Sequence, residues 1–454
     1  MSAPLIWIIF PIFIACFSFF IRRMKNIVWI TLTLFSFVLS LIAWILPIGD
    51  LVNIGPWYFT INENLEFAGR QFVLGNSDRW LIILIYFTQT YFYFGSKFTK
   101  VSSLFLPLGL LFSASLVASI SIHPILYAAL LIEVAVLLGV PLLSPPGKKI
   151  EHAILVYITF LSLGLPFMIV GTGMLSGAEL EELSLPNILP SLLVLGIGFA
   201  FILAVFPLNP WVPLILEKSN PYSSVFMLTI FSTSVIALLM RFTNQYPWIM
   251  ESNLLQYFGI LMVITGGAWA LFQRNLGRIL GYAILIDMGY ALLAISQSGG
   301  SPYFVGLLIP RIIAYGVWGL GLSFVLDHGM DLNFRSVQGI GRQFPLIVLG
   351  ILIANFSLAG IPLFASFPYL LWLWNRIAET SIFIAIVLLM GNVGLMTSAL
   401  RSLAVLVMGS EIVEPKARAT TQILDLLFIL GVFIMVVIGI FPNWPYLMIR
   451  QFLP

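Results

Sequence analysis

Long apolar runs alternate with short polar segments along almost the whole chain. A window of about 20 apolar residues, the length that crosses the hydrocarbon core of a bilayer, finds about fourteen such runs. They start near Pro4, Ile27, Trp80, Leu104, Pro124, Ala153, Leu189, Tyr222, Leu254, Ile279, Pro302, Pro345, Ile382 and Gln422. Cations follow the first run rather than precede it, so we expect a retained helix and not a signal peptide. The pattern predicts an all-α polytopic membrane protein with about fourteen transmembrane helices.

The longest polar insert lies between the second and third runs, at about residues 48–79. Apolar and polar residues alternate across 57–75, around a polar turn at 62–64. Because alternation with a period of two is typical of strands, we predict a β-hairpin outside the membrane. The other loops are short, and the rest of the chain is expected to form one helical bundle.

Lysine and arginine residues are distributed unevenly between alternate loops. The odd-numbered loops hold Arg22, Arg23, Lys25, Lys97, Lys100, Lys148, Lys149, Lys218, Arg274, Arg278, Arg335, Arg342, Arg401, Lys416 and Arg418. The even-numbered loops hold Arg70, Arg79, Arg241, Arg376 and Arg450. Cytoplasmic loops are enriched in such cations, so both termini are expected on the non-cytoplasmic side. We expect an integral protein of a prokaryotic plasma membrane or a thylakoid-type membrane.

Composition supports the membrane class and excludes several kinds of chemistry. Hydrophobic residues make up 60% of the chain and charged residues 9%, and the mean hydropathy is +1.07. A single cysteine, Cys16, excludes intrachain disulfides, Cys-ligated iron–sulfur clusters and Cys-pair zinc sites, and three histidines leave few other metal ligands. The sequence contains no Gly-Lys-Ser/Thr phosphate loop, no HExxH and no strand-led GxGxxG. We expect no cofactor in this chain, no metal site and no nucleic-acid partner.

Two features recur along the chain at nearly the same spacing. Glu133 and Asp287 each follow a Leu-Ile pair inside an apolar run, and Pro207 and Pro362 each end a four-residue apolar segment that begins with alanine. An offset of about 154 residues relates both pairs and maps helices four to eight onto helices nine to thirteen. Five helices per unit is an odd number, so the second copy would be inverted in the membrane.

The duplication divides the chain into four parts. We assign helices one to three and the hairpin to residues 1–102, the first repeat to 103–252, the second, inverted repeat to 253–409, and the last helix to 410–454.

Prolines are expected to interrupt one helix in each repeat. Pro207 and Pro210 fall in helix seven, and Pro362 and Pro368 fall in helix twelve. A proline inside a helix removes a backbone donor and clashes with the preceding turn. Discontinuous helices in inverted repeats are typical of the sites of ion-moving membrane proteins, so helices seven and twelve are the expected location of such a site.

Three segments carry a resemblance to a known family. They are residues 198–217 (GFAFILAVFPLNPWVPLILE), 273–290 (beginning QRNLGRILGY and ending DMGY) and 357–362 (SLAGIP). In this order they resemble the seventh-helix motif, the loop and tenth helix, and the twelfth-helix break of the antiporter-like membrane subunits of respiratory complex I. The likeness covers most of helices four to thirteen, and the chain is most similar to subunit N. The same fold serves multi-subunit sodium/proton antiporters, membrane-bound hydrogenases and carbon-concentrating relatives.

The titratable relay positions of that family differ in this chain. The family's fifth-helix glutamate corresponds to Glu133, which is retained. Its lysine or histidine positions correspond to Ile202 in helix seven, Ser232 in helix eight, Gly277 before helix ten, Asp287 in helix ten and Leu370 in helix twelve. The resemblance implies a proton path built on a lysine that exchanges its proton beside the glutamate, and isoleucine and leucine cannot do this.

The remaining candidates for a proton path are Glu133, Asp287, Arg311 and His123. Glu133 has lost its cation, so its carboxyl is expected to be neutral and to serve either as a proton site or as a structural hydrogen-bonding group. Arg311 lies within an apolar run, opposite either Asp287 or Glu133. Because arginine does not release its proton at accessible pH, such a pair would be fixed. His123 lies at a helix end, where it is interfacial or a point of proton entry.

Other polar and aromatic clusters have simpler interpretations. The acidic cluster Glu179, Glu181 and Glu182 is expected to be a solvated face. The aromatic runs at 91–94 and 372–374 are expected to face lipid or form an interfacial belt, with a quinone site as the alternative.

The resemblance implies an antiporter-like membrane-arm subunit of a complex-I-type NAD(P)H- or ferredoxin-quinone oxidoreductase, with proton pumping weakened or lost. Redox chemistry would then belong to other subunits, and this chain would have no redox catalytic site of its own. Its expected partners are other membrane-arm subunits and lipids. A non-pumping spacer or docking subunit is the alternative. A stand-alone cation/proton antiporter is a second alternative, disfavoured because it would need the lysines that are missing.

Overall fold

The protein is described here by a computed structural model. It describes residues 1–454 except 55–56, 145–149, 179–184, 247–248, 250–251, 298, 409–421 and 445–454. The expectations for Lys148, Lys149, Glu179, Glu181, Glu182, Lys416, Arg418 and Arg450 lie outside the described residues.

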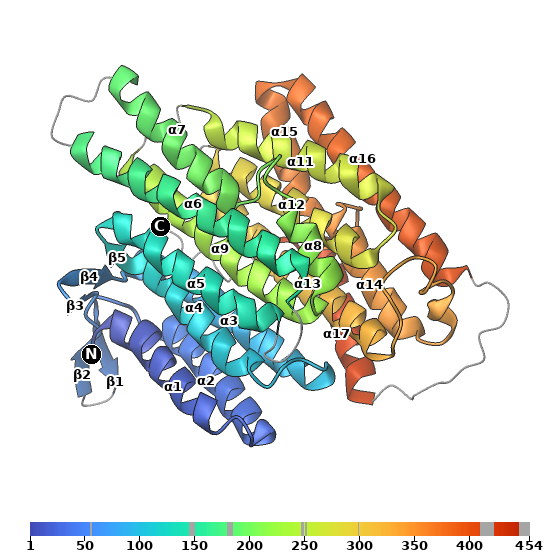
Figure 1. Ribbon diagram of the computed structural model, residues 1–454, viewed down its shortest axis with the longest axis horizontal. Helices are drawn as coiled ribbons and strands as arrows, with labels where there is room; N and C mark the ends of the chain where they lie inside the picture. The colour runs from blue at the N-terminus through green and yellow to red at the C-terminus, as the bar shows by residue number, and fades with distance from the viewer. Residues whose placement is uncertain are drawn as a thin grey trace.

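The described chain is a bundle of long helices that run roughly along one common direction (Figure 1). In the first half they are η1 (Leu5–Ile9), α1 (Phe10–Phe20), α2 (Lys25–Ile45), α3 (Arg79–Gly95), α4 (Phe105–Ser121), α5 (Ala128–Leu143), α6 (His152–Ala178), α7 (Leu185–Ile202), α8 (Trp211–Lys218) and α9 (Pro221–Gln245). In the second half they are α11 (Leu254–Phe272), α12 (Leu276–Ile295), α13 (Ser301–Asp327), α14 (Pro345–Leu358), α15 (Phe367–Thr380), α16 (Ile382–Val407) and α17 (Gln422–Ile440). Single turns η2 (Asn76–Asp78), η3 (Ser96–Phe98), η4 (Ile125–Tyr127) and η5 (Ile340–Arg342) lie in the connections.

Within the described residues, nine helices are long and apolar enough to cross a membrane. Shorter apolar helices cover Leu5–Phe20, Phe105–Ser121, Leu189–Ile202 and Pro345–Leu358. The prediction of a mainly helical, polytopic membrane protein is therefore confirmed. The count of fourteen spans and the inverted repeats stay predictions.

Three helices form the centre of the bundle. The apolar windows of α9, α12 and α13 are 94%, 89% and 89% buried, whereas those of α2, α6 and α17 are 33%, 33% and 28% buried. A helix that is apolar on all sides belongs in such a centre or against lipid. Polar side chains on α9, α12 and α13 are therefore removed from both lipid and water, and they must find partners on neighbouring helices.

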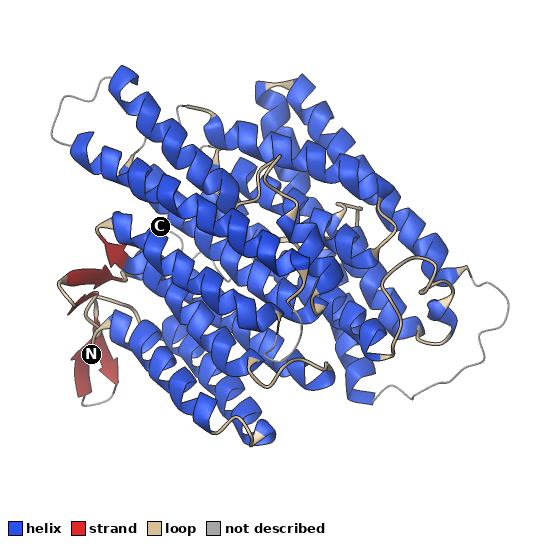
Figure 2. Cartoon of the chain, viewed as in Figure 1, coloured by secondary structure: helices blue, strands red, loops and turns tan. Residues whose placement is uncertain are grey.

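The β-structure lies at one end of the helices, next to the N-terminus (Figure 2). Strand β1 (Leu51–Ile54) pairs with β2 (Trp57–Thr60), and β3 (Asn64–Phe67) pairs with β4 (Arg70–Val73), both antiparallel. Strand β5 (Ile122–His123) adds to the edge of β4.

The predicted single hairpin with its turn at 62–64 is wrong in its pairing. Strand β2 pairs with β1, the strand that precedes it in the chain, and not with β3. The turn of the second hairpin, between β3 and β4, falls at Ala68 and Gly69, which have φ angles of 51° and 71°. Two consecutive positive φ angles fit the twist of a two-residue hairpin, and glycine adopts one of them without steric cost. Alternation alone did not show which strands pair.

Two residues of the aromatic run at 91–94 lie in the core rather than facing lipid. Phe92 and Tyr93 are fully buried, and the hydroxyl of Tyr93 donates to the carbonyl of Leu106. Trp374, in the second aromatic run, is also buried, and its indole N–H donates to the Tyr290 hydroxyl at 3.1 Å. At Phe92, Tyr93 and Trp374 the expectation of lipid-facing rings is wrong, because these rings point between helices, whereas Phe94 is 42% exposed.

Candidate functional site

Arg311 and Asp287 form an ion pair in the centre of the bundle. Arg311 lies on α13 and is 0% exposed, and Asp287 lies on α12 and is 8% exposed. The guanidinium Nε is 2.9 Å from Oδ2 of the carboxylate. Tyr315, one turn further along α13, donates its hydroxyl to the same oxygen at 2.7 Å. Since each charge has an opposite charge beside it, the cost of burying either one alone is avoided.

The guanidinium of Arg311 also reaches a third helix. Its Nη2 donates to the hydroxyl of Ser232 on α9 at 3.1 Å. The third nitrogen, Nη1, is buried and has no hydrogen-bond partner among the described residues. The positive charge of Arg311 therefore lies among side chains from three helices, α9, α12 and α13.

Glu133 lies apart from this cluster. It is half-buried on α5, and the hydroxyl of Ser162 on α6 donates to its Oε1 at 2.5 Å. Its neighbours on α5, Leu130 and Val134, are each 46% exposed. Of the two acids proposed to lie opposite Arg311, Asp287 is the one that pairs with it. Glu133 is on the outer side of the bundle, with a hydroxyl instead of a cation as its described partner.

Three other positions that the resemblance would align with lysines are buried among apolar neighbours or lie against backbone. Ile202 and Leu370 are each 2% exposed and belong to the apolar core. A side chain at Gly277 would overlap the backbone carbonyl of Leu216 on α8. Close helix packing therefore fills the space that a lysine would need at Gly277, and apolar packing fills it at the other two positions.

The helical path is interrupted between α7 and α8. Helix α7 ends at Ile202 and α8 begins at Trp211, and Ala204 between them has a left-handed φ of 57°. Pro207 lies in this interval, and Pro210 is the residue immediately before α8. Proline cannot donate to the helix, but it fits the first position of a new one.

A second interruption separates α14 and α15. Helix α14 ends at Leu358 and α15 begins at Phe367, with Pro362 between them. Pro368 lies in the first turn of α15 rather than in the interruption. Asn392 of α16 donates to the carbonyl of Ala359 at 2.7 Å, which satisfies a backbone group that the interrupted helix leaves free.

Sequence reasoning missed several polar residues of the central region. Tyr315 follows Arg311 by four residues, so it lies on the same face of α13, and this spacing was visible in the sequence. Asn355 on α14 is fully buried, and neither atom of its side-chain amide has a partner among the described residues. Nothing in its local sequence marks it, because its surroundings come from other helices.

His123 lies outside the helical bundle, in strand β5, where it pairs with Gln71 of β4. Near it, Arg241 at the end of α9 forms an ion pair with Asp78, with Nη2 at 2.6 Å from Oδ2. Burial, and next the charge of Arg241, lower the pKa of His123 from its ordinary value, while Asp78 acts in the opposite direction. The structure places His123 in the sheet, well separated along α4 and α9 from the central ion pair.

A polytopic helical bundle with two interrupted helices and buried charges at its centre has the architecture of ion-moving membrane proteins. A family model described as NADH:quinone oxidoreductase/Mrp antiporter, transmembrane, matches residues 158–395, and the chain belongs to this family. The match starts in α6 and ends in α16, so it includes both interruptions and the Arg311–Asp287 pair.

Related sequences support the resemblance to subunit N. NADH-quinone oxidoreductase subunit N of Leptospira interrogans is 28% identical over 52% of this chain and 48% of its own length. Subunit N 1 of Herpetosiphon aurantiacus is 29% identical over 56% of this chain and 54% of its own. The chain thus spans about half the length of the relatives it matches.

Solved structures share the fold over nearly the whole chain. A chain of the archaeal membrane-bound sulfane sulfur reductase has a TM-score of 0.84 at 18% identity and covers 99% of this chain and 97% of that one. A chain of the Mrp complex from Dietzia sp. DQ12-45-1b has a TM-score of 0.79 at 15% identity, covering 98% and 96%. A chain of respiratory complex I from Thermus thermophilus has a TM-score of 0.72 at 20% identity, covering 98% of each.

Proposed function

We propose that this chain is an antiporter-like membrane-arm subunit of a complex-I-type NAD(P)H- or ferredoxin-quinone oxidoreductase. Its family, the names of its relatives and the full-length likeness to subunits of multi-subunit membrane complexes support this role. Its partners would be other membrane-arm subunits and lipids. Electron transfer would take place on other subunits, and this chain would hold no cofactor.

We propose further that this subunit has lost the lysine-based proton relay and acts mainly as a spacer in the membrane arm. The observation that carries this proposal is the buried pair of Arg311 and Asp287, with Nε at 2.9 Å from Oδ2. Arginine keeps its proton at accessible pH, so the pair cannot alternate between charged and neutral forms as a lysine can. Apolar packing at Ile202 and Leu370 supports the same conclusion.

A second candidate function is residual proton transfer that uses Glu133 and ordered water. The buried and unpaired amide of Asn355 and the unpaired Nη1 of Arg311 favour it. Buried polar groups without a protein partner are commonly satisfied by water, and a chain of waters conducts protons. The stand-alone antiporter remains the least favoured candidate, because the same lysine positions are missing.

The experiment is to measure protons translocated per electron by the complete assembly in sealed vesicles, with Glu133→Gln in this subunit. A spacer predicts an unchanged ratio and an unchanged electron-transfer rate. A lower ratio at an unchanged rate would establish residual transfer through Glu133. The matched control is Glu379→Gln, because Glu379 is an exposed acid that pairs with Arg376 at the bundle surface. If the purified chain alone exchanged cations for protons in vesicles, the stand-alone alternative would replace both.

We also propose that residues 103–252 and 253–409 are two inverted five-helix units. The interruptions after α7 and after α14 occupy equivalent places in these units, which supports the proposal. Lys218 ends α8 and Arg376 lies four residues before the end of the equivalent helix α15, so inversion predicts them on opposite sides of the membrane. Single-cysteine variants at these two positions, made after Cys16→Ser, should react with an impermeant maleimide from opposite sides. Reaction from the same side would contradict inversion.

A further inference from the structure

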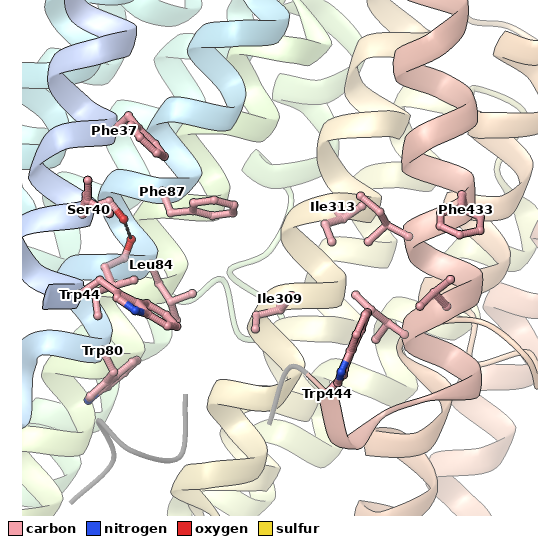
Figure 3. A pocket seen from close by; sticks show the side chains of 15 residues that line it. Phe37, Ser40, Trp44, Trp80, Leu84, Phe87, Ile309, Ile313, Phe433 and Trp444 are labelled. Atoms are coloured by element: carbon pink, nitrogen blue, oxygen red, sulfur yellow. Dashed lines mark hydrogen bonds between the residues drawn. The ribbon is translucent and has the colours of Figure 1, made fainter. Parts of the chain in front are cut away.

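The hollow between α2, α3, α13 and α17 carries no charge that could select a ligand (Figure 3). Its described lining is apolar except for indole N–H groups and Ser40, whose hydroxyl donates to the carbonyl of Ile83 at 3.1 Å. A set of arginines at the ends of α11 and α16 is different, because these arginines carry charge that no described acid pairs with.

The connection between α11 and α12 is paired with the loop that follows α13. The backbone N–H of Phe334 donates to the carbonyl of Arg274 at 2.9 Å. The side-chain amide of Asn275 donates to that of Asn333 at 3.1 Å, between the same two segments. These bonds fix Arg274 beside Phe334 and therefore close to the next residue of the loop, Arg335.

Arg401 brings a third guanidinium group to this place from within α16. It precedes the end of that helix at Val407 and follows Leu400, which is 47% exposed. Its Nη1 donates to the carbonyl of Leu271 in the last turn of α11, and its guanidinium carbon lies 5.6 Å from the centroid of the Phe334 ring. A long cationic side chain that starts in an apolar span and reaches its border places its charge at the level of the lipid headgroups.

Arg274, Arg335 and Arg401 form an arginine cluster without a counter-charge among the described residues. The side chains of Arg274 and Arg335 are exposed and make no hydrogen bond or ion pair with a described residue, and Arg401 is bonded to a carbonyl alone. The loop 328–344 contains one acid, Asp331, and it forms no ion pair within the described part of the chain. Because like charges repel one another, an anion that binds several of these guanidinium groups lowers the free energy of the cluster.

We propose that the arginine cluster binds the phosphate group of an anionic membrane phospholipid. Guanidinium groups bind phosphate oxygens through paired N–H donors, and basic sites between transmembrane helices on the cytoplasmic side bind anionic headgroups. All three arginines belong to the odd-numbered loops, whose excess of cations predicts that side. Trp269 and Phe272, just before Arg274, are 51% and 71% exposed, so an amphiphile can place its charge on the cluster and its acyl chain beside these rings.

The experiment places the photoreactive residue p-benzoylphenylalanine at Phe272, in the complete assembly in nanodiscs that contain equal amounts of phosphatidylglycerol and phosphatidylcholine. Light attaches this side chain to the molecule that lies against it, and mass spectrometry identifies the adduct. Phe272 tolerates the replacement because it is 71% exposed. We expect about five phosphatidylglycerol adducts for each phosphatidylcholine adduct, because one cation near the membrane surface favours an anionic lipid roughly fivefold.

Arg274→Gln together with Arg335→Gln should bring the two kinds of adduct toward equal amounts. The fold should be retained, because both side chains are exposed and the bonds that join the two segments do not use them. The matched control is Arg23→Gln together with Lys25→Gln, which removes the same charge from two exposed cations before and at the start of α2. This control should leave the adduct ratio unchanged. An equal fall in both double variants would assign the selection to net charge and contradict a site at the arginine cluster.

Four other results would overturn the proposal. Equal amounts of the two lipid adducts with the cluster intact would show that the site does not select an anionic headgroup. Adducts mainly with residues 409–421 would make the chain's own acids, Glu411 and Glu414, the counter-charge. Adducts mainly with another subunit would make the occupant an acidic protein surface. Loss of the lipid selection when inorganic phosphate replaces chloride at constant ionic strength would make free phosphate the ligand.

Discussion

The guanidinium of Arg311 lies 2.9 Å from the carboxylate of Asp287, and this pair joins two central helices of the bundle. Ser232 extends the contact to a third helix, α9. The centre of the bundle therefore carries a buried positive charge. It is held on a residue that keeps its proton and cannot leave its partner without exposing a buried charge.

Removing one member of this pair should destabilise the protein strongly. Asp287→Asn leaves the guanidinium of Arg311 buried without a counter-charge, and we expect a loss of about 3–5 kcal/mol in the free energy of unfolding. Thermal or denaturant unfolding in detergent micelles measures it. Replacing both residues, as Asp287→Leu with Arg311→Leu, should cost much less than Asp287→Asn alone.

The control for this prediction is an ion pair at the surface. Arg376 and Glu379 lie 2.8 Å apart with both side chains largely exposed, and Arg376→Gln should change stability by less than about 1 kcal/mol. Equal losses in Asp287→Asn and Arg376→Gln would show that the central pair is not a buried one.

Helix packing at Gly277 predicts a second stability effect. An added methyl group would overlap the carbonyl oxygen of Leu216, so Gly277→Ala should cost about 1–3 kcal/mol by forcing α8 and α12 apart. Gly173→Ala is the matched control within α6, because a Cβ there meets nothing within 4 Å. That control should be neutral or stabilising by up to about 1 kcal/mol, since alanine favours a helix over glycine. A neutral Gly277→Ala would show that α8 and α12 do not pack closely at this glycine.

The length of the apolar runs was enough to locate the helices in the sequence. It was not enough to show which face of each helix is buried and which faces lipid. The run predicted to begin near Pro302 corresponds to α13, and the one near Tyr222 corresponds to α9. Which side of each run faces lipid depends on neighbours that are distant in the sequence. For this reason the run at 91–94 was expected at the surface, whereas Phe92 and Tyr93 pack in the core.

The candidate site was predictable only as a set of residues, not as an arrangement. The acids and Arg311 were visible as charges within apolar runs, but two acids remained possible partners for the arginine. Choosing Asp287 over Glu133 requires knowing that α12 and α13 are adjacent central helices while α5 is peripheral. The same applies to the strands, because local alternation could not tell that β2 pairs with β1 rather than with a later strand.

Arg241 is predicted to hold the β-structure against the helices. Its guanidinium donates to the carboxylate of Asp78 at 2.6 Å and to the carbonyl of Ile120, which precedes β5. Arg241→Gln should weaken this attachment by about 1.5–3 kcal/mol, the usual worth of hydrogen bonds to charged groups. Faster hydrogen exchange in β4 and β5, with unchanged exchange in α12 and α13, would measure it.

The control for Arg241 lies in the same sheet. Arg70 stacks on the ring of Tyr127 with 4.0 Å between its guanidinium carbon and the ring centroid, and Arg70→Gln removes only this contact. We expect a loss of about 0.5–1 kcal/mol there. If both variants had the same effect on exchange, the ion pair of Arg241 would have no special role.

The sheet should also respond to pH through His123. Burial, and next the nearby Arg241, lower the pKa of His123 in the folded state below its ordinary value of 6.5. The neutral imidazole is therefore the form that the folded sheet favours, and its contribution to stability is fully present above pH 6.5. That contribution is lost as the pH falls from 6.5 through the lower pKa of the folded state, because protonation then favours a detached strand.

Hydrogen exchange of the β4 and β5 amides at about pH 8 and about pH 5, corrected for intrinsic rates, should show this loss of protection at the lower pH. His123→Asn, which cannot titrate, should make the protection of these amides independent of pH over the same range. In Arg241→Gln the pKa of His123 should rise toward 6.5, because one of the two causes that lower it is gone. As the pH is lowered, protection of the β4 and β5 amides in Arg241→Gln would begin to fall at the same pH as in the unchanged protein. It would stop falling at a higher pH, because the pKa of His123 in the folded state is higher in this variant. A pH response that persists unchanged in His123→Asn would assign it to another group and leave His123 as a structural residue of the sheet.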